Sequence, residues 1–514
     1  EMRMRQPAAV IAAMVALLVT VSCSPAQRVD LGQGSGNLIA AIAGEPDQLD
    51  PQKTSAYFSF EVLENVFDTL VEPDANLEMR PALAESWEVS ADQLGWTFRL
   101  RHGVTFHDGS PFTADDVVYS YRRIIDAKLA NADKLSSVTG VTAPDPSTVR
   151  ITLKQPTPNL LTNLGGFKGL AIVSRRNVES GQIATHPVGT GPFAFQGQKS
   201  GDSITLKANP GYWAGAPKVS GVTFRFISEP STALSALQAG EIDWTDAIPT
   251  QRVKQLKEDD SVTLAATPSN DYWYLALNEA RAPWNDVRVR KAIAYAIDRD
   301  AIVAATSYGT AVANQLAIPK GNPWYTPYDG YRHDVARAKN LLAEASQTGI
   351  AAPKTLDMLV TTQYPATVTA AQIIADNLAP LGITVNIRTD DFASWLDEQN
   401  NGHFDMLMMG WLGNIDPDDF YYAQHHTDGS SNAQKFSNPE VDRLLDAARV
   451  ETNRNARADD YAKAATIIAD QVSYIYLYNP SVIQAWTTRL SGYQARRDGA
   501  IRFRTATLAP GGAA

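Results

Sequence analysis

Short segments with strand-like and helix-like patterns alternate along most of the chain from residue 37 onward, and this alternation restricts the fold more than any other feature. Alternating or continuous apolar runs predict strands at residues 37–43, 97–100, 149–153, 203–207 and 222–227. Apolar residues at helical spacing predict helices at residues 60–70, 113–125, 231–240, 288–306, 335–345, 367–381 and 455–472. Because no internal repeat accompanies the series, it predicts a mixed α/β fold.

Length and charge limit the class of protein further. The chain has 514 residues, of which 44 % are hydrophobic, so it can bury a large core, and its length predicts two or three lobes. Charged residues make up 20 % of the chain, a composition typical of folded rather than disordered proteins. The net charge is −11 and no basic run stands out, which argues against nucleic acid or an anionic membrane surface as the main partner.

The N-terminal residues have the pattern of an export signal. Arg3 and Arg5 precede an apolar run at residues 8–21, which is too short to span a bilayer. We therefore expect residues 1–23 to be a signal peptide. Residues 24–36, rich in Gly and polar side chains, are expected to form a flexible tether.

Cys23 is the only cysteine of the chain, so no disulfide can form within one molecule. Its position directly after the apolar run resembles the lipid-bearing cysteine of bacterial lipoproteins, and two acyl chains on it would suffice for lasting membrane anchorage. Thr20 departs from that pattern, which prefers a large aliphatic residue there. An ordinary signal peptide with an incidental cysteine is the alternative.

The most specific motif of the chain lies at residues 84–125, which include GWTFRLR at 95–101 and FHDGSPFTADDV at 106–117. Further motifs follow along the chain: GTGPF at 189–193, NPGYW at 209–213, GEID at 240–243, PWNDVRVR at 283–290, AIAYAIDR at 292–299, FD at 404–405, GW at 410–411 and DP at 416–417. In this order they resemble the extracellular solute-binding proteins, family 5, which serve peptide- and nickel-type ABC importers. The resemblance covers nearly all of the chain after the signal and is closest to the peptide-binding members.

The resemblance implies a type II periplasmic-binding-protein fold in its large form, with two main lobes, an accessory subdomain and a two-crossing hinge. Lobe I is expected at residues 37–70, 195–280 and 480–514, the accessory subdomain at 71–194 and lobe II at 281–479. The chain would cross between the lobes near Asn278 and again near residues 478–480. Ligand would bind between the lobes and stabilise the closed form, which an importer's permease would recognise.

The motif at residues 84–125 is interpreted as structural rather than functional. Trp96, Phe98 and Leu100 alternate as a core face of a strand. His102 and His107 lie in a strand-to-turn segment and do not share a helical face, so no metal site is expected there.

Ligand contacts are expected, by resemblance, in three segments. They comprise Ser55, Ala56 and Tyr57, then Tyr272 and Trp273, and finally Met409, Gly410, Trp411, Leu412, Gly413 and Asn414. Backbone edges in the first and third segments would pair with an extended ligand irrespective of its side chains. Core packing is the alternative for the aromatic pair, and Trp411 is the aromatic residue favoured as a ligand contact.

Two departures from the dipeptide-binding members favour longer peptides. Those members carry an aspartate for the ligand's free amine where this chain has Asn414. Asp416 or Asp418 could replace it, although Asp416 equally fits a structural turn. Dipeptide binders also hold the ligand carboxylate with an arginine, and residues 361–369 contain none. A longer peptide held through its backbone is therefore the favoured ligand.

Other ligands and other classes of protein stay open. His425 and His426 could bind haem or a nickel chelate through imidazole nitrogen, although a solvated turn is the favoured interpretation of the two histidines. A secreted hydrolase would need a catalytic pair; the sequence has no GxSxG or HExxH motif, and Asp418 with Asp419 is the nearest acidic pair. A receptor role with the same fold is a third option. We expect no enzymatic activity, no cofactor, no nucleic acid partner, a monomer, and anchorage in the cell envelope through Cys23.

Overall fold

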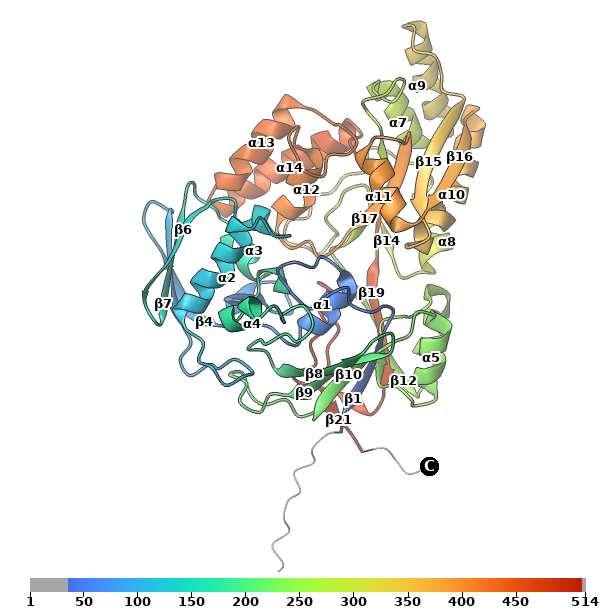
Figure 1. Ribbon diagram of the computed structural model, residues 1–514. Helices are drawn as coiled ribbons and strands as arrows, with labels where there is room; N and C mark the ends of the chain where they lie inside the picture. Colours follow the sequence, from blue (N-terminus) through green and yellow to red (C-terminus); the bar gives the residue numbers. More distant parts are fainter. Residues whose placement is uncertain (1–35, 511–514) are drawn as a thin grey trace, which may run out of the picture. The chain divides into compact units, whose positions relative to one another are not determined.

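A computed structural model describes residues 36–510, which belong to one compact unit (Figure 1). The predicted signal peptide at 1–23, Cys23 with its predicted lipid, and all but the last residue of the tether predicted at 24–36 lie outside the described residues. Within residues 36–510, no helix is long and apolar enough to cross a membrane.

Lobe I is built around a seven-stranded sheet, at the bottom of Figure 1, whose order is β12-β19-β11-β1-β10-β9-β8. Its strands are β1 (Leu38–Ile42), β8 (Phe193–Lys199), β9 (Ser203–Ala208), β10 (Gly221–Phe226), β11 (Trp244–Thr245), β12 (Val262–Pro268) and β19 (Ser481–Thr487). β1 runs parallel to both of its neighbours and is almost wholly buried, as its continuous apolar run predicts. Helices α1 (Tyr57–Leu63), α5 (Pro230–Gln238) and α6 (Val253–Lys257) belong to the same lobe.

Lobe II is built around a six-stranded sheet of order β14-β18-β13-β17-β15-β16. Its strands are β13 (Tyr272–Leu277), β14 (Val312–Ala313), β15 (Thr355–Thr361), β16 (Thr384–Asp390), β17 (Met406–Trp411) and β18 (Ile475–Asn479). Its helices are α7 (Val287–Ala296), α8 (Arg299–Ser307), α9 (Val335–Gln347), α10 (Pro365–Leu378), α11 (Phe392–Asn400), α12 (Pro417–His425), α13 (Pro439–Val450) and α14 (Arg454–Asp470). One hydrophobic core lies on each face of this sheet.

The accessory subdomain contains a four-stranded antiparallel sheet, at the left of Figure 1, in the order β4-β5-β7-β6. Its elements are β4 (Ala84–Val89), β5 (Gly95–Leu100), β6 (Val138–Asp145), β7 (Thr148–Leu153), α2 (Ala114–Asp126), α3 (Leu160–Gly165) and α4 (Arg175–Glu179). Trp96, Phe98 and Leu100 are buried as predicted. Thr113 caps α2 in a capping box with Asp116, so the predicted helix start is confirmed.

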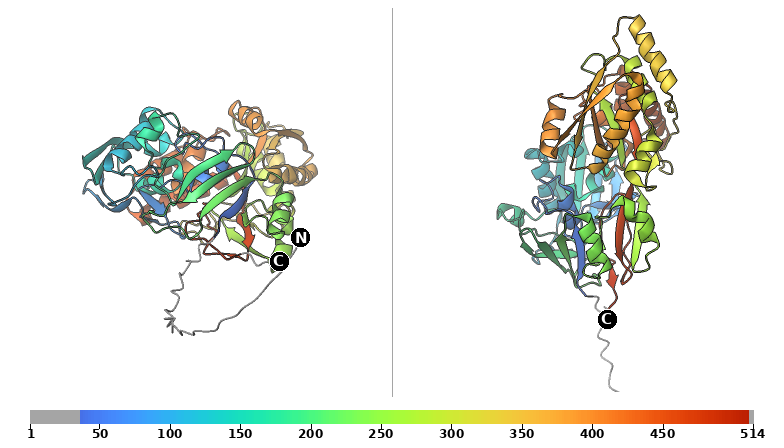
Figure 2. Two further views of the ribbon diagram at one scale, coloured as in Figure 1. Left: turned by 60° about the horizontal axis from the view of Figure 1, so that its bottom comes forward. Right: turned by 90° about the vertical axis from the view of Figure 1, so that its right-hand side faces the viewer.

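Small hairpins complete the fold: β2 (Val71–Pro73) pairs with β3 (Met79–Pro81), and β20 (Leu490–Ser491) pairs with β21 (Thr507–Leu508). The chain passes between the two large sheets through residues 269–271, from β12 to β13, and through Pro480, from β18 to β19. Figure 2 shows the red C-terminal strands returning to the blue and green part. The first crossing lies before the predicted position near Asn278, because β13 pairs with β17 and β18 of lobe II. The remaining lobe bounds stay predictions.

Two predicted helices have different bounds in the structure. The helix expected at residues 60–70 ends at Leu63, because the backbone carbonyls of Asn65 and Val66 accept bonds from Phe193 and Gly191 instead of from their own helix. The helix expected at 288–306 is divided between α7 and α8. Asp298 caps α8 by accepting a bond from the Ala301 N–H, which favours a new helix start at that point.

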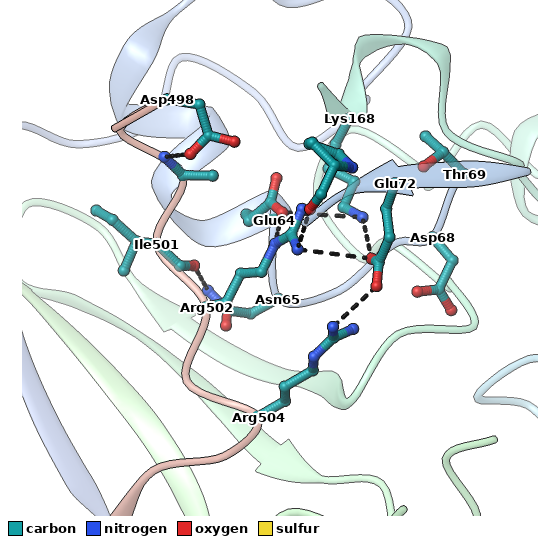
Figure 3. A network of polar contacts seen from close by, with 12 residues as sticks. Glu64, Asn65, Asp68, Thr69, Glu72, Lys168, Asp498, Ile501, Arg502 and Arg504 are labelled. Atoms are coloured by element: carbon teal, nitrogen blue, oxygen red, sulfur yellow. Dashed lines mark hydrogen bonds and ion pairs between the residues drawn. The ribbon is translucent and has the colours of Figure 1, made fainter. Parts of the chain in front are cut away.

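A buried charge network joins the C-terminal segment to β2 and to the 3-10 helix Lys168–Leu170 (Figure 3). Arg502 lies 2.7 Å from Glu64, Arg504 lies 2.8 Å from Glu72, and the Lys168 ammonium is within 3.8 Å of both carboxylates. Burial alone would raise the pKa of Glu72, but the charges of Arg502, Lys168 and Arg504 outweigh it and lower this pKa to about 2. The network thereby holds the chain around Ile501 in place beside the central cavity.

Candidate ligand-binding cleft

A cavity of about 900 Å³ is lined by residues from lobe I, lobe II and the accessory subdomain. Lobe I contributes α1 and the start of β19, lobe II contributes the loop after β17, and the accessory subdomain contributes residues around Lys134 and Lys168. This volume is near the upper end of the roughly 300–1,000 Å³ typical of small-molecule sites. The cavity is therefore large enough for a ligand of several residues.

The loop after β17 forms the lobe II wall of the cavity. Trp411 is half-buried and its indole N–H donates to the Tyr474 hydroxyl over 3.4 Å, while the Leu412 side chain is 54 % exposed. Gly413 adopts a φ of +71°, which favours glycine, and its N–H donates to Asp271 Oδ1 over 2.9 Å. Asn414 is buried. The structure thus brings these four predicted residues together at the cavity.

Ser55 and Tyr57 line the lobe I wall, as the sequence predicts, whereas Ala56 does not. Ala56 is the N-cap residue of α1, and its carbonyl accepts the bond from the Phe60 N–H. The Tyr57 hydroxyl donates to Asp246 Oδ2 over 2.9 Å. A side chain from α1 and one from the loop after β11 therefore meet at the cavity.

Four predicted contacts are corrected. Tyr272 and Met409 are buried in the lobe II core, and Trp273 packs against Tyr364 and Tyr478 on the other face of the sheet. Gly410 pairs with Trp273 within the sheet. Because β13 and β17 are adjacent inner strands, helices cover both faces of these residues, and none of them lines the cavity.

The two aspartates predicted as replacements for the missing amine partner are already paired. Asp416 caps α12 and forms a bidentate ion pair with Arg457, with distances of 2.7 and 2.6 Å, and it does not line the cavity. Asp418 does line the cavity, but both of its oxygens accept bonds from Arg449, over 2.9 and 3.1 Å. The structure therefore places Asp416 outside the cavity, in the structural role that was its alternative interpretation.

The cavity also has acidic residues that the sequence did not single out. Glu61, Asp246 and Asp271 all line it. Loss of water around its side chain raises the pKa of Asp271 to about 7, although the bond from the Gly413 N–H opposes this. One sequence feature could have pointed to Glu61: it is a charged residue inside a segment of mostly apolar residues. A prediction based on helical spacing alone gives such a residue no role.

The basic residues of the cavity wall are all ion-paired with the protein's own carboxylates. Lys134 lies 3.6 Å from Asp419, Lys168 belongs to the charge network, and Arg449 holds Asp418. Among residues 36–510, the cavity therefore offers no unpaired cation to a ligand's carboxylate.

Several buried polar atoms of the wall lack a hydrogen-bond partner. They are both carboxylate oxygens of Glu61, the amide nitrogens of Asn414 and Gln484, and the amide oxygen of Gln424. Buried polar groups in folded proteins are nearly always paired, so unpaired ones on residues that line a cavity are consistent with a ligand that supplies the partners. The set includes both donors and acceptors, which is the requirement for binding a peptide backbone.

The histidines predicted as alternative ligands lie elsewhere. His425 is fully buried between Ser473 and Tyr476, at 2.7 and 3.0 Å, and burial lowers its pKa to about 3. His426 does not line the cavity either. His107 bonds the backbone of Gly191 over 2.9 Å in the GTGPF turn. Residues 36–510 contain no cluster of side chains suited to a metal ion.

The acidic pair proposed for a hydrolase is likewise occupied. Asp418 is held by Arg449, and Asp419 accepts bonds from the N–H groups of Ile415 and Asp416 in the capping box of α12. Neither carboxylate is free to act as a general acid or base.

Comparison with known proteins identifies the family. The sequence profile described as "Bacterial extracellular solute-binding proteins, family 5 Middle" matches residues 78–432, more than half of the chain. The chain belongs to this family. Family 5 membership was the prediction drawn from the motifs, and it is confirmed.

Relatives of this family 5 protein cover most of its length. Heme-binding protein A of Haemophilus influenzae is 31 % identical over 468 residues, 84 % of each chain. The periplasmic murein peptide-binding protein of Escherichia coli is 30 % identical over 517 residues, 93 % of this chain and 95 % of that one. The solved ABC transporter-associated periplasmic binding protein of Helicobacter pylori, in complex with the peptide STSA, has a TM-score of 0.82 and 27 % identity over 93 % of this chain and 99 % of that one. These similarities confirm the predicted fold class.

Proposed function

We propose that this family 5 protein captures peptides in the cleft between its lobes and delivers them to the permease of an ABC importer. The relatives from Escherichia coli and Helicobacter pylori carry peptides in their names or structures and are similar along nearly the whole chain. Closure of the lobes on the ligand would then signal the loaded state to the permease.

One observation carries the proposal for this chain itself: the unpartnered donors and acceptors of the cavity wall. Asn414 and Gln484 offer amide N–H groups from opposite lobes, and Gln424 offers an amide oxygen. An extended backbone presents alternating C=O and N–H groups that such side chains can bind without reading the ligand's side chains. Trp411 and Tyr57 add aromatic surface at the same cavity.

We further infer that the ligand is longer than a dipeptide. Within residues 36–510 every cationic side chain of the wall has a carboxylate partner, so the carboxylate end of a dipeptide meets no unpaired cation there, and Asn414 is neutral where dipeptide-binding members carry an aspartate. The cavity volume of about 900 Å³ favours the same conclusion.

The remaining parts of the proposal concern location and activity. We infer a non-enzymatic, monomeric protein that Cys23 anchors to the membrane after export. Cys23→Ser should release the protein from the membrane fraction of producing cells, as measured by immunoblot of the separated fractions. Retention of the variant in that fraction would show that lipid on Cys23 is not the anchor.

Haem is the second candidate, because a haem-binding relative is 31 % identical. Against it, no histidine of residues 36–510 lines the cavity. Native mass spectrometry and an absorption spectrum of protein purified from its own cells distinguish the candidates. A mixture of bound peptides supports the proposal, whereas a Soret band with no bound peptide contradicts it.

A further inference from the structure

One pair of carboxyl groups in the cleft has no counter-charge from the described part of the chain, residues 36–510. Glu61 lies on α1, is 3 % exposed and lines the cavity, and neither of its carboxylate oxygens has a hydrogen-bond partner. Burial raises the pKa of Glu61 well above its usual range, and the charge of the adjacent Asp246 raises it further. No lysine or arginine of residues 36–510 is among the neighbours that act on this carboxyl.

The carboxyl groups of Glu61 and Asp246 have few hydrogen-bond donors near them in the described part of the chain. Tyr57 has a single O–H, which it donates to Asp246 Oδ2 over 2.9 Å. Two carboxylates within hydrogen-bonding reach can bond each other only through a proton, because neither ionised group is a donor. The pair therefore holds a proton of its own or receives donors from a bound molecule.

We propose that Glu61 and Asp246 form a subsite for an ammonium group of the bound peptide, with Tyr57 orienting the Asp246 carboxylate. The inference rests on the proposed peptide capture and specifies its substrate class. An ammonium carries three N–H donors on one atom, which suits the two unpartnered oxygens of Glu61 and a lone pair of Asp246. Buried ionised groups persist where they are paired and hydrogen-bonded, and this ligand group supplies both conditions.

The charges elsewhere on the wall favour the same ligand group. Asp271 adds a further carboxyl to the cavity wall, and Lys134, Lys168 and Arg449 are neutralised by their own partners. The wall is therefore acidic in balance and attracts a cation. The N-terminal ammonium of a peptide and the side chain of a lysine share the required chemistry.

Affinity selection from defined peptide mixtures tests the subsite. The full chain is incubated with three equimolar mixtures of tetrapeptides, and the bound peptides are quantified by mass spectrometry. The first mixture has free N-termini and no Lys, Arg or His; the second is the same mixture N-acetylated; the third is N-acetylated with one lysine. The proteins compared are the wild type, Glu61→Gln, Asp246→Asn, and Glu258→Gln, an exposed carboxylate of lobe I away from the cavity.

The wild type and Glu258→Gln should enrich the first or the third mixture over the second by about tenfold or more. Glu61→Gln and Asp246→Asn should lose this preference while still binding the acetylated peptides. Preference for the first mixture identifies an N-terminal ammonium, and preference for the third identifies a lysine side chain.

Equal enrichment of all three mixtures by the wild type would overturn the subsite but leave peptide capture standing. The subsite would also be overturned if Glu61→Gln kept the preference. Failure of the wild type to bind any mixture would instead contradict the proposed function. Thermal unfolding of each variant shows that lost preference does not reflect lost folding; because Glu61→Gln removes a buried carboxyl that no cation of residues 36–510 stabilises, its melting temperature should not fall.

Discussion

Two glutamates one helical turn apart, Glu61 and Glu64, have opposite surroundings. Glu64 lies in the charge network with Arg502 at 2.7 Å and Lys168 at 3.8 Å. Glu61 lines the same cavity as Glu64, but the neighbour that acts on it is another acid, Asp246, and no cation of residues 36–510 does so. Both side chains are buried, so both carry a desolvation cost, but only that of Glu64 is offset within the protein. The difference separates a carboxylate that stabilises the fold from one that is available to a ligand.

The largest expected effect comes from removing a cation of the charge network that holds Glu64. Arg502→Met leaves Glu64 and Glu72 buried with less counter-charge, so it should lower the free energy of unfolding by about 3–5 kcal/mol. Chemical denaturation measures this value. Arg80→Met is the matched control, because Arg80 pairs with Asp74 and Glu78 at the surface with 58 % of its side chain exposed. The control should leave the free energy of unfolding nearly unchanged, because its ion pairs are exposed to solvent; equal effects of the two variants would mean that the network is not stabilising.

The second-largest effect should be the loss of folding stability at acid pH. The pKa of Glu72 is lowered from 4.5 to about 2, so the folded state binds fewer protons there than the unfolded state. Its contribution is present above pH 4.5 and is lost as the pH falls from 4.5 toward 2. This shift corresponds to about 3 kcal/mol. Unfolding of the wild type and of Glu72→Gln across this range should show a steeper acid loss in the wild type, and parallel curves would contradict the assignment.

The contribution of Glu61 to folding stability should change with pH in the opposite direction to that of Glu72. The pKa of Glu61 is raised, so the folded state binds more protons, and stability falls as the pH rises above 4.5. Glu61→Gln should therefore be more stable than the ligand-free wild type at neutral pH, by about 1 kcal/mol. The difference should shrink below pH 4.5, as measured by denaturation of both proteins stripped of ligand. A destabilised Glu61→Gln would mean that the protein itself compensates this carboxylate.

A further prediction concerns binding rather than stability, through a carboxylate introduced on the opposite wall. Asn414→Asp places a negative charge where the amide nitrogen of Asn414 has no partner, and it should increase preference for peptides with a free N-terminal amine by roughly tenfold. Calorimetry with free and N-acetylated forms of one peptide measures this. Asn401→Asp, at an exposed helix end, is the control. Unchanged affinities for both forms would remove Asn414 from the site.

Local sequence patterns predicted the elements of this fold better than the contacts between them. The strand at residues 37–43 and the start of α2 at Thr113 follow from spacing and capping chemistry within a few residues. The burial of Tyr272 could not be predicted locally, because it depends on β17 and β18 pairing on both sides of β13. In the same way, Glu61 and Asp246 lie far apart in sequence and meet only after α1 and β11 have been placed in lobe I.

The return of the chain through Pro480 has a consequence for biosynthesis. β19 lies between β12 and β11, so it closes the lobe I sheet only after all of lobe II has been translated. A nascent chain cannot complete its first lobe before its second, and the ordinary order of folding from the N-terminus is blocked here. A chain that ends before β19 would retain every strand of the lobe II sheet while β12 lost its only neighbour in lobe I. The last strand of the lobe I sheet to be synthesised, β19, thus decides when β1 becomes part of a finished sheet.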